Sequence, residues 1–274
     1  MRVHAVFAGM GTEIVVRTDR LADVRARFAT VERVASRFIA DSDLQRLNAD
    51  PRESIPVAGD LAALFAAAAA IRGPTAGLVD PAVGRAVVEW GYDRDIAAVG
   101  GLDAVPNIGG AGRWEYADGV LERDPGVVFD FGGIAKGWIC DHVVEEGLAS
   151  FASAGGDLRS LEPDLRVEVV DPWGEVAATV GVGVGALATS SIARRRWRAG
   201  SGTAHHLIDP RLGAPADTPV LSATVVAETA LEAEAGAKAV LLRGVEGLAW
   251  ADDQPWIRSA IVVWDGGSVY GTAA

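Results

Sequence analysis

The sequence predicts an α+β protein, with mainly antiparallel sheets and packed helices, that folds as one compact unit over residues 1–274. Half of the residues are hydrophobic and 33 of the 274 are glycine, a composition typical of a globular chain with a sizeable core. Strand-like and helix-like patterns both occur, but they do not alternate in the regular order of parallel βαβ units. The chain shows no internal repeat at the spacing of solenoid or propeller units.

The first residues of the chain predict strands, and the residues that follow them predict helices. Residues 3–16 have the composition of two strands interrupted at residues 9–12. In residues 19–47 apolar side chains recur every three or four positions, which predicts helix, and Ser42 can cap a short second helix. Further along we expect an alanine-rich helix at 59–71, a short helix at 82–90, a peripheral helix and loop at 92–108, and a hairpin at 114–121 that turns at Asp118-Gly119.

The stretch from Val127 to Trp138 is the most distinctive part of the chain. Residues 127–131 are apolar and β-prone, two glycines follow, and residues 138–151 are compatible with helix. Glycines let the backbone approach a ligand closely, and a helix start offers N–H groups to an anion. A buried strand followed by a capped turn has the same pattern. The segment alone therefore leaves both interpretations open.

The C-terminal part repeats the mixture of strands and helices. We expect strands at 166–170, 177–184 and 222–226, a helix with small side chains at 229–242, and a closing hairpin that turns at Gly266-Gly267.

Charge and cysteine content exclude several functions. The formal net charge of −12 argues against a nucleic-acid-binding protein, which needs a basic surface. Cys140 is the only cysteine, so neither an intramolecular disulfide nor a cysteine-based metal site can form, and a small core residue is its usual role. The N-terminus lacks a long apolar segment, and the longest apolar run, residues 61–71, is too short to span a bilayer. We therefore expect a cytoplasmic protein without membrane insertion.

Several polar clusters could carry chemistry, and each has an ordinary structural alternative. His205 and His206 are more often surface or hydrogen-bonded core histidines than catalytic groups. Glu234 and Lys238 lie one helical turn apart, a spacing most often used by surface ion pairs. The arginine-rich segment 194–198 is more often a solvated edge than a binding surface for an acidic target.

The order of the clusters is more specific than any one of them, and it resembles that of the ApbE-like FAD:protein FMN transferases nearly end to end. The matching segments, with the family pattern in parentheses, are residues 9–12 (M-G-T), 38–48 (Y-x-x-x-S-E-L-x-R-L-N), 77–84 with 90–92 (G-x-F-D-P-x-V-G and W-G-F), 130–137 (D-L-G-G-I-A-K-G), 154–157 (N-A-G-G-D), 188–190 (A-T-S-G), 206–213 (H-I-I-D-P-x-T-G) and 233–239 (A-D-A-L-A-T-A).

The resemblance implies an ApbE-like fold related to the T-fold, and an enzyme that uses FAD and usually Mg²⁺. Such enzymes split FAD, join its FMN phosphoryl group to a threonine hydroxyl of a target flavoprotein and release AMP, which is metal-assisted phosphoryl transfer. By position, His206 would take the threonine proton and Asp209 would orient His206. FAD would contact Met10, Phe38, Leu78, Val79, Asp80, Asp130, Lys136 and Leu207, and the metal would be held by Gly133, Glu234, Ala237 and Lys238.

The chain departs from the family pattern at three of these positions. Phe38 stands where the family usually has tyrosine, Glu234 replaces an aspartate that binds the metal, and Lys238 replaces a threonine that binds it. A protonated lysine is no ligand for Mg²⁺, and its charge opposes the cation. Three hypotheses follow: a transferase in which an ammonium group takes the place of the metal or the metal site is adapted, a flavin-binding relative without activity, and an FAD-dependent reductase.

Overall fold

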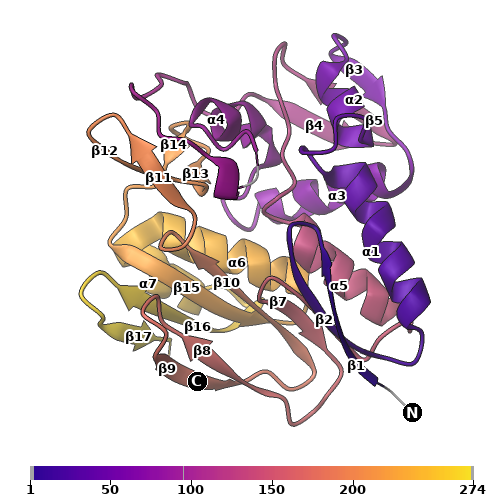
Figure 1. The fold of residues 1–274 in the computed structure, drawn as a ribbon, viewed down its shortest axis with the longest axis vertical. Helices are drawn as coiled ribbons and strands as arrows, with labels where there is room; N and C mark the ends of the chain where they lie inside the picture. The colour runs from indigo at the N-terminus through magenta and orange to yellow at the C-terminus, as the bar shows by residue number, and fades with distance from the viewer. Residues whose placement is uncertain (1–2, 95, 273–274) are drawn as a thin grey trace. The chain divides into compact units, whose positions relative to one another are not determined.

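The structure is a computed structural model that describes residues 3–94 and 96–272 (Figure 1). The chain divides into two compact units. Unit 1 comprises residues 1–32, 134–193 and 218–274, and unit 2 comprises residues 33–133 and 194–217. The expected α+β class with antiparallel sheets is confirmed, whereas the single domain over residues 1–274 stays a prediction.

Unit 1 is built on one eight-stranded sheet whose neighbouring strands are all antiparallel. In spatial order its strands are β1 (Val3–Gly9), β2 (Thr12–Thr18), β6 (Phe151–Ala154), β7 (Asp157–Ser160), β10 (Gly185–Ser191), β15 (Val220–Ala227), β16 (Ile257–Trp264) and β17 (Val269–Gly271). A separate hairpin pairs β8 (Arg166–Val170) with β9 (Val176–Gly181).

Two helices of unit 1 pack against this sheet and against each other. Helix α6 (Ala230–Arg243) lies along β10 and β15, and α5 (Ala135–Glu145) lies along β6 and β7 (Figure 1). Small side chains on α6 permit this close packing, because a Cβ at Gly236 would already lie 3.0 Å from Val225. A capping box closes the start of α6, where Thr229 and Glu232 exchange hydrogen bonds. Helix α7 (Gly247–Asp252) and the 3₁₀ turn η3 (Gly244–Glu246) follow.

Unit 2 has its own aromatic core. The ring of Phe65, on α3, has its centroid 4.9 Å from that of Phe129, 5.0 Å from Phe131 and 5.9 Å from Trp114. The last three residues of helix α1 (Leu21–Ala35) belong to this unit, which begins at residue 33. The remaining elements are α2 (Asp43–Ala49), α3 (Gly59–Arg72), η1 (Pro81–Val83), α4 (Gly84–Glu89), η2 (Ile96–Ala98), a sheet of β3 (Ser54–Pro56), β5 (Val120–Arg123) and β4 (Trp114–Ala117), and the pairs β11 (Arg196–Ala199) with β12 (Gly202–His205) and β13 (Ile208–Asp209) with β14 (Ala214–Pro215).

The strand expected at residues 127–131 is wrong. The segment is buried as predicted, with Phe129 and Phe131 fully inaccessible, but it has no strand partner. The Asn48 side chain donates to the carbonyl of Phe129 at 2.9 Å and accepts from its N–H at 2.8 Å. Asp130 donates its N–H to the carbonyl of Pro81 at 2.8 Å. A side chain and loop carbonyls thus satisfy backbone groups that a sheet would otherwise pair.

Other local expectations hold with shifted ends. The hairpins that turn at residues 118–119 and 265–268 are confirmed, and Ser42 caps α2 by accepting from the N–H of Gln45. The strand expected at 3–16 is interrupted as predicted, and its two parts, β1 and β2, pair as a hairpin that turns at residues 10–11. The helix expected at 19–47 breaks after Ala35. Helix α5 ends at Glu145 rather than at residue 151, because Gly147 adopts a φ of 69° and Phe151 begins β6. Among the described residues, no helix combines the length and hydropathy needed to cross a membrane.

Candidate functional site

In unit 1, the side chain of Lys136 lies between two buried carboxylates. Its Nζ donates to Oδ2 of Asp157, at the start of β7, and to Oε1 of Glu234, on α6, each at 2.6 Å. Asp157 and Glu234 are only 3% and 4% exposed. Burial disfavours the Lys136 ammonium, but the two carboxylates outweigh this effect and hold its pKa above the usual value. Lys136 is therefore a fixed positive charge.

Both oxygens of Glu234 are engaged inside the protein. While Oε1 accepts from Lys136, Oε2 accepts the backbone N–H of Gly137 at 2.8 Å. Lys238 follows one helical turn later on α6, is half-buried, and its charge acts on the Asp157 carboxylate. Burial raises the pKa of Asp157 to about 6, against the opposing effect of Lys136. We refer to Lys136, Asp157, Glu234 and Lys238 as the lysine cluster.

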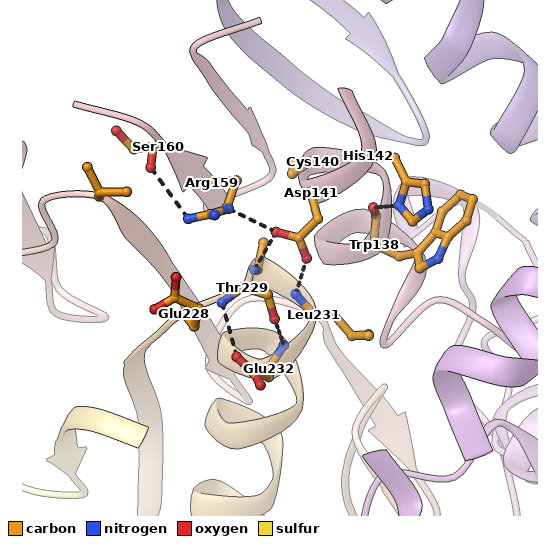
Figure 2. Close-up of polar contacts among 12 residues, drawn as sticks. Trp138, Cys140, Asp141, His142, Arg159, Ser160, Glu228, Thr229, Leu231 and Glu232 are labelled. Carbon is orange, nitrogen blue, oxygen red and sulfur yellow. Dashed lines mark hydrogen bonds and ion pairs between the residues drawn. The ribbon is translucent and has the colours of Figure 1, made fainter. Parts of the chain in front are cut away.

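A second set of contacts fixes α6 relative to α5 (Figure 2). Asp141, on α5, accepts the N–H of Ala230 at 2.7 Å and that of Leu231 at 2.9 Å, so its carboxylate lies at the positive end of the α6 dipole. Arg159 Nε is 3.5 Å from the same carboxylate. Burial raises the pKa of Asp141 to about 7, although both N–H groups favour the ionised form. These contacts hold the start of α6 against α5, and so they fix the position of the helix that carries Glu234 and Lys238.

Gly137 makes this close approach of the two helices possible. A Cβ at this position would lie 2.5 Å from the carbonyl oxygen of Ala230 and 2.9 Å from the nitrogen of Leu231. Only a glycine lets α5 come near enough for its N–H to reach Glu234. Gly137, the last glycine of the stretch 130–137, thus permits the helix packing on which the lysine cluster depends.

In unit 2, Arg37 contacts two of the predicted site residues, Asp130 and Phe38. Its Nε is 2.8 Å from Oδ2 of Asp130, and the two side chains are only 9% and 12% exposed. The guanidinium carbon lies 4.0 Å from the ring centroid of Phe38 and 4.4 Å from that of Tyr92. Tyr92 in turn meets His206 edge to face, with centroids 6.2 Å apart. We refer to Arg37, Phe38, Tyr92, Asp130 and His206 as the ring cluster.

One face of the ring cluster is open. Phe38 is 51% exposed, and its phenyl group packs on the Arg37 guanidinium. The ring can therefore stack a flat partner on its free side. Because residues 38, 130 and 206 come from distant segments, their meeting in one cluster is a property of the fold.

The two adjacent histidines have different environments. His205 is buried, its Nδ1 accepts the N–H of Leu207 at 3.3 Å, and its Nε2 lies 3.0 Å from the carbonyl of Ala216. These partners fit a neutral ring, and burial lowers the pKa of His205. His205 is thus a structural histidine, while His206 contacts Tyr92 within the ring cluster. Asp209, predicted to orient His206, is buried and accepts from Nε and Nη2 of Arg211.

The other predicted FAD contacts lie in different surroundings. Met10, in unit 1, occupies the first position of the two-residue turn between β1 and β2 with a φ of 52°, a conformation that is strained for a side chain of this kind. In unit 2, Leu78, Val79, Asp80 and Leu207 are buried. Asp80 accepts from Trp114 Nε1 at 2.8 Å and pairs with Arg72, so its carboxylate is already used within the unit.

The residues predicted to hold Mg²⁺ do not fit that ion. Mg²⁺ requires several oxygen ligands at about 2.0–2.1 Å, yet both Glu234 oxygens are engaged and Lys238 offers no lone pair when protonated. Alanine and glycine have no side-chain ligand atom, so Ala237 and Gly133 could contribute only backbone oxygens. Within residues 3–94 and 96–272, no group of three or more His, Cys, Asp or Glu side chains is arranged to hold a metal.

The sequence alone did not single out three residues of these clusters. Asp157 ends the matched segment 154–157 and was visible there as a carboxylate after two glycines. Tyr92 ends the matched segment 90–92. Arg37 precedes Phe38 in the chain but has no signal of its own, because its role depends on Asp130, 93 positions away.

Comparison with protein families gives one match that covers most of the chain. The model of the ApbE family matches residues 10–261. Among curated relatives, the FAD:protein FMN transferase of Rhodobacter capsulatus is 30% identical over 300 residues, which cover 98% of this chain and 57% of that protein. That of Salmonella typhimurium is 28% identical over 235 residues, covering 77% and 67%.

Solved structures agree with this match. The ApbE protein from Thermotoga maritima superposes with a TM-score of 0.86 and 25% identity, covering 99% of this chain and 97% of that one. The flavin transferase ApbE from Vibrio cholerae superposes with a TM-score of 0.83, covering 100% and 97%, and its 23% identity supports the fold alone.

Proposed function

Since this chain belongs to the ApbE family, we propose that it is an FAD:protein FMN transferase and that its acceptor is a threonine of a target flavoprotein. The ring cluster is the observation that carries this proposal. It brings together Phe38, Asp130 and His206, to which the family resemblance assigns ring stacking, nucleotide contact and proton transfer.

In the proposed reaction the threonine hydroxyl attacks the phosphorus of the FMN half of FAD. The new bond joins the threonine oxygen to that phosphorus, and the bond between this phosphorus and the bridging oxygen breaks. AMP leaves with the electron pair of the broken bond. The proton of the hydroxyl passes to the ring of His206 as general base.

Each unit, taken by itself, offers a feature that suits FAD. In unit 2, the open face of Phe38 is a platform for a flat ring, either isoalloxazine or adenine. In unit 1, Lys136 and Lys238 balance the carboxylates of Asp157 and Glu234, and an ammonium group can donate charge-assisted hydrogen bonds to phosphate oxygens. The Mg²⁺ that the family usually employs would have to be held by Gly133, Glu234, Ala237 and Lys238, and because these residues do not fit it, we assign no step to a metal.

The test is a transfer assay with the purified chain. The protein is incubated with FAD and a threonine-bearing FMN-binding domain, AMP is measured by chromatography, and the acceptor is examined for covalent flavin by in-gel fluorescence. We expect AMP and flavinylated acceptor in equal amounts. His206→Asn should reduce the rate about 10²–10⁴-fold. His4→Asn is the matched control, since His4 is exposed on β1.

Two other outcomes would overturn the proposal. If FAD binds but neither AMP nor labelled acceptor forms with Mg²⁺, Mn²⁺ or EDTA, the chain is a flavin-binding relative without transferase activity. If bound FAD is instead reduced by a nicotinamide donor and is recovered intact, the reductase hypothesis gains support.

A further inference from the structure

We propose that the ammonium group of Lys238 takes the place of a divalent metal ion beside the FAD diphosphate, so that this chain binds FAD without a metal. This inference rests on the proposed function in that it takes FAD to be the ligand. It concerns a binding site made of the lysine cluster in unit 1.

Both oxygens of Glu234 and one oxygen of Asp157 already accept hydrogen bonds within the cluster. Lys136 holds Oδ2 of Asp157 and Oε1 of Glu234 at 2.6 Å, and the N–H of Gly137 holds Oε2 of Glu234 at 2.8 Å. A metal ion that used Glu234 would have to displace Lys136, Gly137 or both. Displacing Lys136 would leave a buried ammonium without its partners, which is costly.

The cluster contains two carboxylates and two ammonium groups, so it is neutral as it stands. Lys238 lies one helical turn from Glu234 on α6 and near enough for its charge to act on Asp157, so its ammonium supplies the positive charge that a cation would otherwise bring. An ammonium also donates charge-assisted hydrogen bonds to phosphate oxygens.

Both positively charged positions of the cluster carry lysine rather than arginine. The chain has 25 lysine and arginine residues, and only Lys136 and Lys238 are lysine. Every other basic side chain is arginine, yet both positions in this cluster carry the compact ammonium. An ammonium is a point charge with three donors that can turn toward several phosphate oxygens, as a metal ion does, whereas a guanidinium is planar and larger.

The binding step involves no covalent change. Lys238 would donate N–H groups to diphosphate oxygens in charge-assisted hydrogen bonds, and Lys136 would keep its carboxylates and add positive potential. The bonds made and broken in the transfer reaction stay those given above.

Having only two lysines makes a direct test possible. Protein labelled with ¹⁵N-lysine should show at most two side-chain Nζ signals, assigned with Lys238→Arg. Mn²⁺ bound at the cluster would broaden both signals, because a paramagnetic ion relaxes nearby nuclei. We expect both signals to persist through a titration with Mn²⁺, and the Lys238 signal to shift when FAD is added without metal.

Variants and FAD affinity supply the second readout, measured by calorimetry. The dissociation constant for FAD should be the same in EDTA and in Mg²⁺. Lys238→Met should weaken binding about 10- to 100-fold, and Mg²⁺ should not restore it. Arg20→Met is the matched control, since Arg20 forms an exposed pair with Asp23. In Glu234→Asp/Lys238→Thr, Mn²⁺ should now broaden the Lys136 signal.

Broadening of both signals in the unaltered chain, loss of FAD binding in EDTA, or unchanged FAD affinity in Lys238→Met would each overturn the inference. The NMR titration needs no variant, so it decides even where a substitution prevents folding. A failure of the proposed function can be distinguished from a failure of this inference. If the chain is not a transferase, AMP is absent under every condition, but FAD binding and the lysine signals still show whether a metal ion binds at the cluster.

Discussion

Replacing Gly137 by alanine should separate the two helices that form the lysine cluster. The new Cβ would lie 2.5 Å from the Ala230 carbonyl oxygen, whereas ordinary contacts are 3.4–4 Å. Both neighbours are backbone atoms of α6, so no side chain can turn away. Helices α5 and α6 must therefore move apart by about 1 Å to restore normal contact distances.

The cost follows from what that movement breaks. Overpacking of this kind costs about 1–3 kcal/mol. The movement also stretches hydrogen bonds to charged carboxylates, those of Asp141 with Ala230 and Leu231 and that of Glu234 with Gly137, and losing one costs about 1.5–3 kcal/mol. Alanine regains about 1 kcal/mol through its higher helix propensity. The net loss of unfolding free energy is about 2–5 kcal/mol.

Urea denaturation followed by tryptophan fluorescence measures this loss by linear extrapolation. Gly181→Ala is the control, because Gly181 lies in β9 of the same unit and a Cβ there meets nothing within 4 Å. That variant should match the unaltered chain or be up to about 1 kcal/mol more stable. Equal unfolding free energies for the Gly137 and Gly181 variants would refute the packing argument.

Three further predictions concern other parts of the molecule. Arg37→Met should lower the unfolding free energy by about 3 kcal/mol because it removes the ion-pair partner of the buried Asp130 carboxylate. Adding Asp130→Asn to this variant should recover part of the loss. Equal unfolding free energies of the single and double variants in urea denaturation would contradict the prediction. Burial raises the pKa of Asp141 to about 7 in the folded state, whereas its ordinary value is 3.8. Between these two pH values the folded chain binds more protons at Asp141 than the unfolded chain does. The contribution of Asp141 to the unfolding free energy therefore falls as the pH rises through this range. Asp141→Asn should make urea unfolding less dependent on pH between 5 and 7 by up to about 1.4 kcal/mol per pH unit; an unchanged slope would count against the raised pKa. Met10→Asn should raise the unfolding free energy by about 1 kcal/mol because asparagine tolerates the left-handed turn, and unchanged FAD affinity in that variant would argue against contact with Met10.

Features set by neighbouring residues were predictable from the sequence. The turn at Asp118-Gly119 and the cap at Ser42 each depend on side chains within a few positions, and both are confirmed. The helix expected at 229–242 matches α6 to within one residue at each end, and a capping box formed by Thr229 and Glu232 closes its start.

Features that depend on distant partners were not predictable. Residues 127–131 have strand composition, but the backbone of Phe129 pairs with the side chain of Asn48, and nothing in the local pattern reveals that partner. In the same way, the spacing of Glu234 and Lys238 suggested a surface ion pair, whereas Glu234 is buried and bonded to Lys136 on another helix. Ordered motifs gave the family, while contacts between segments decide what each residue does.

Glu234 and Lys238, the two α6 positions that differ from the family pattern, depend on each other. Glutamate is longer than aspartate by one C–C bond, roughly 1.5 Å, and this length lets Glu234 bond Lys136 with one oxygen and Gly137 with the other. Both of its oxygens already accept hydrogen bonds inside the protein, and a protonated lysine at position 238 offers a cation no lone pair. On the proposal above, Glu234 stays bonded to Lys136 and Gly137 while Lys238 meets the diphosphate, so the two substitutions act together.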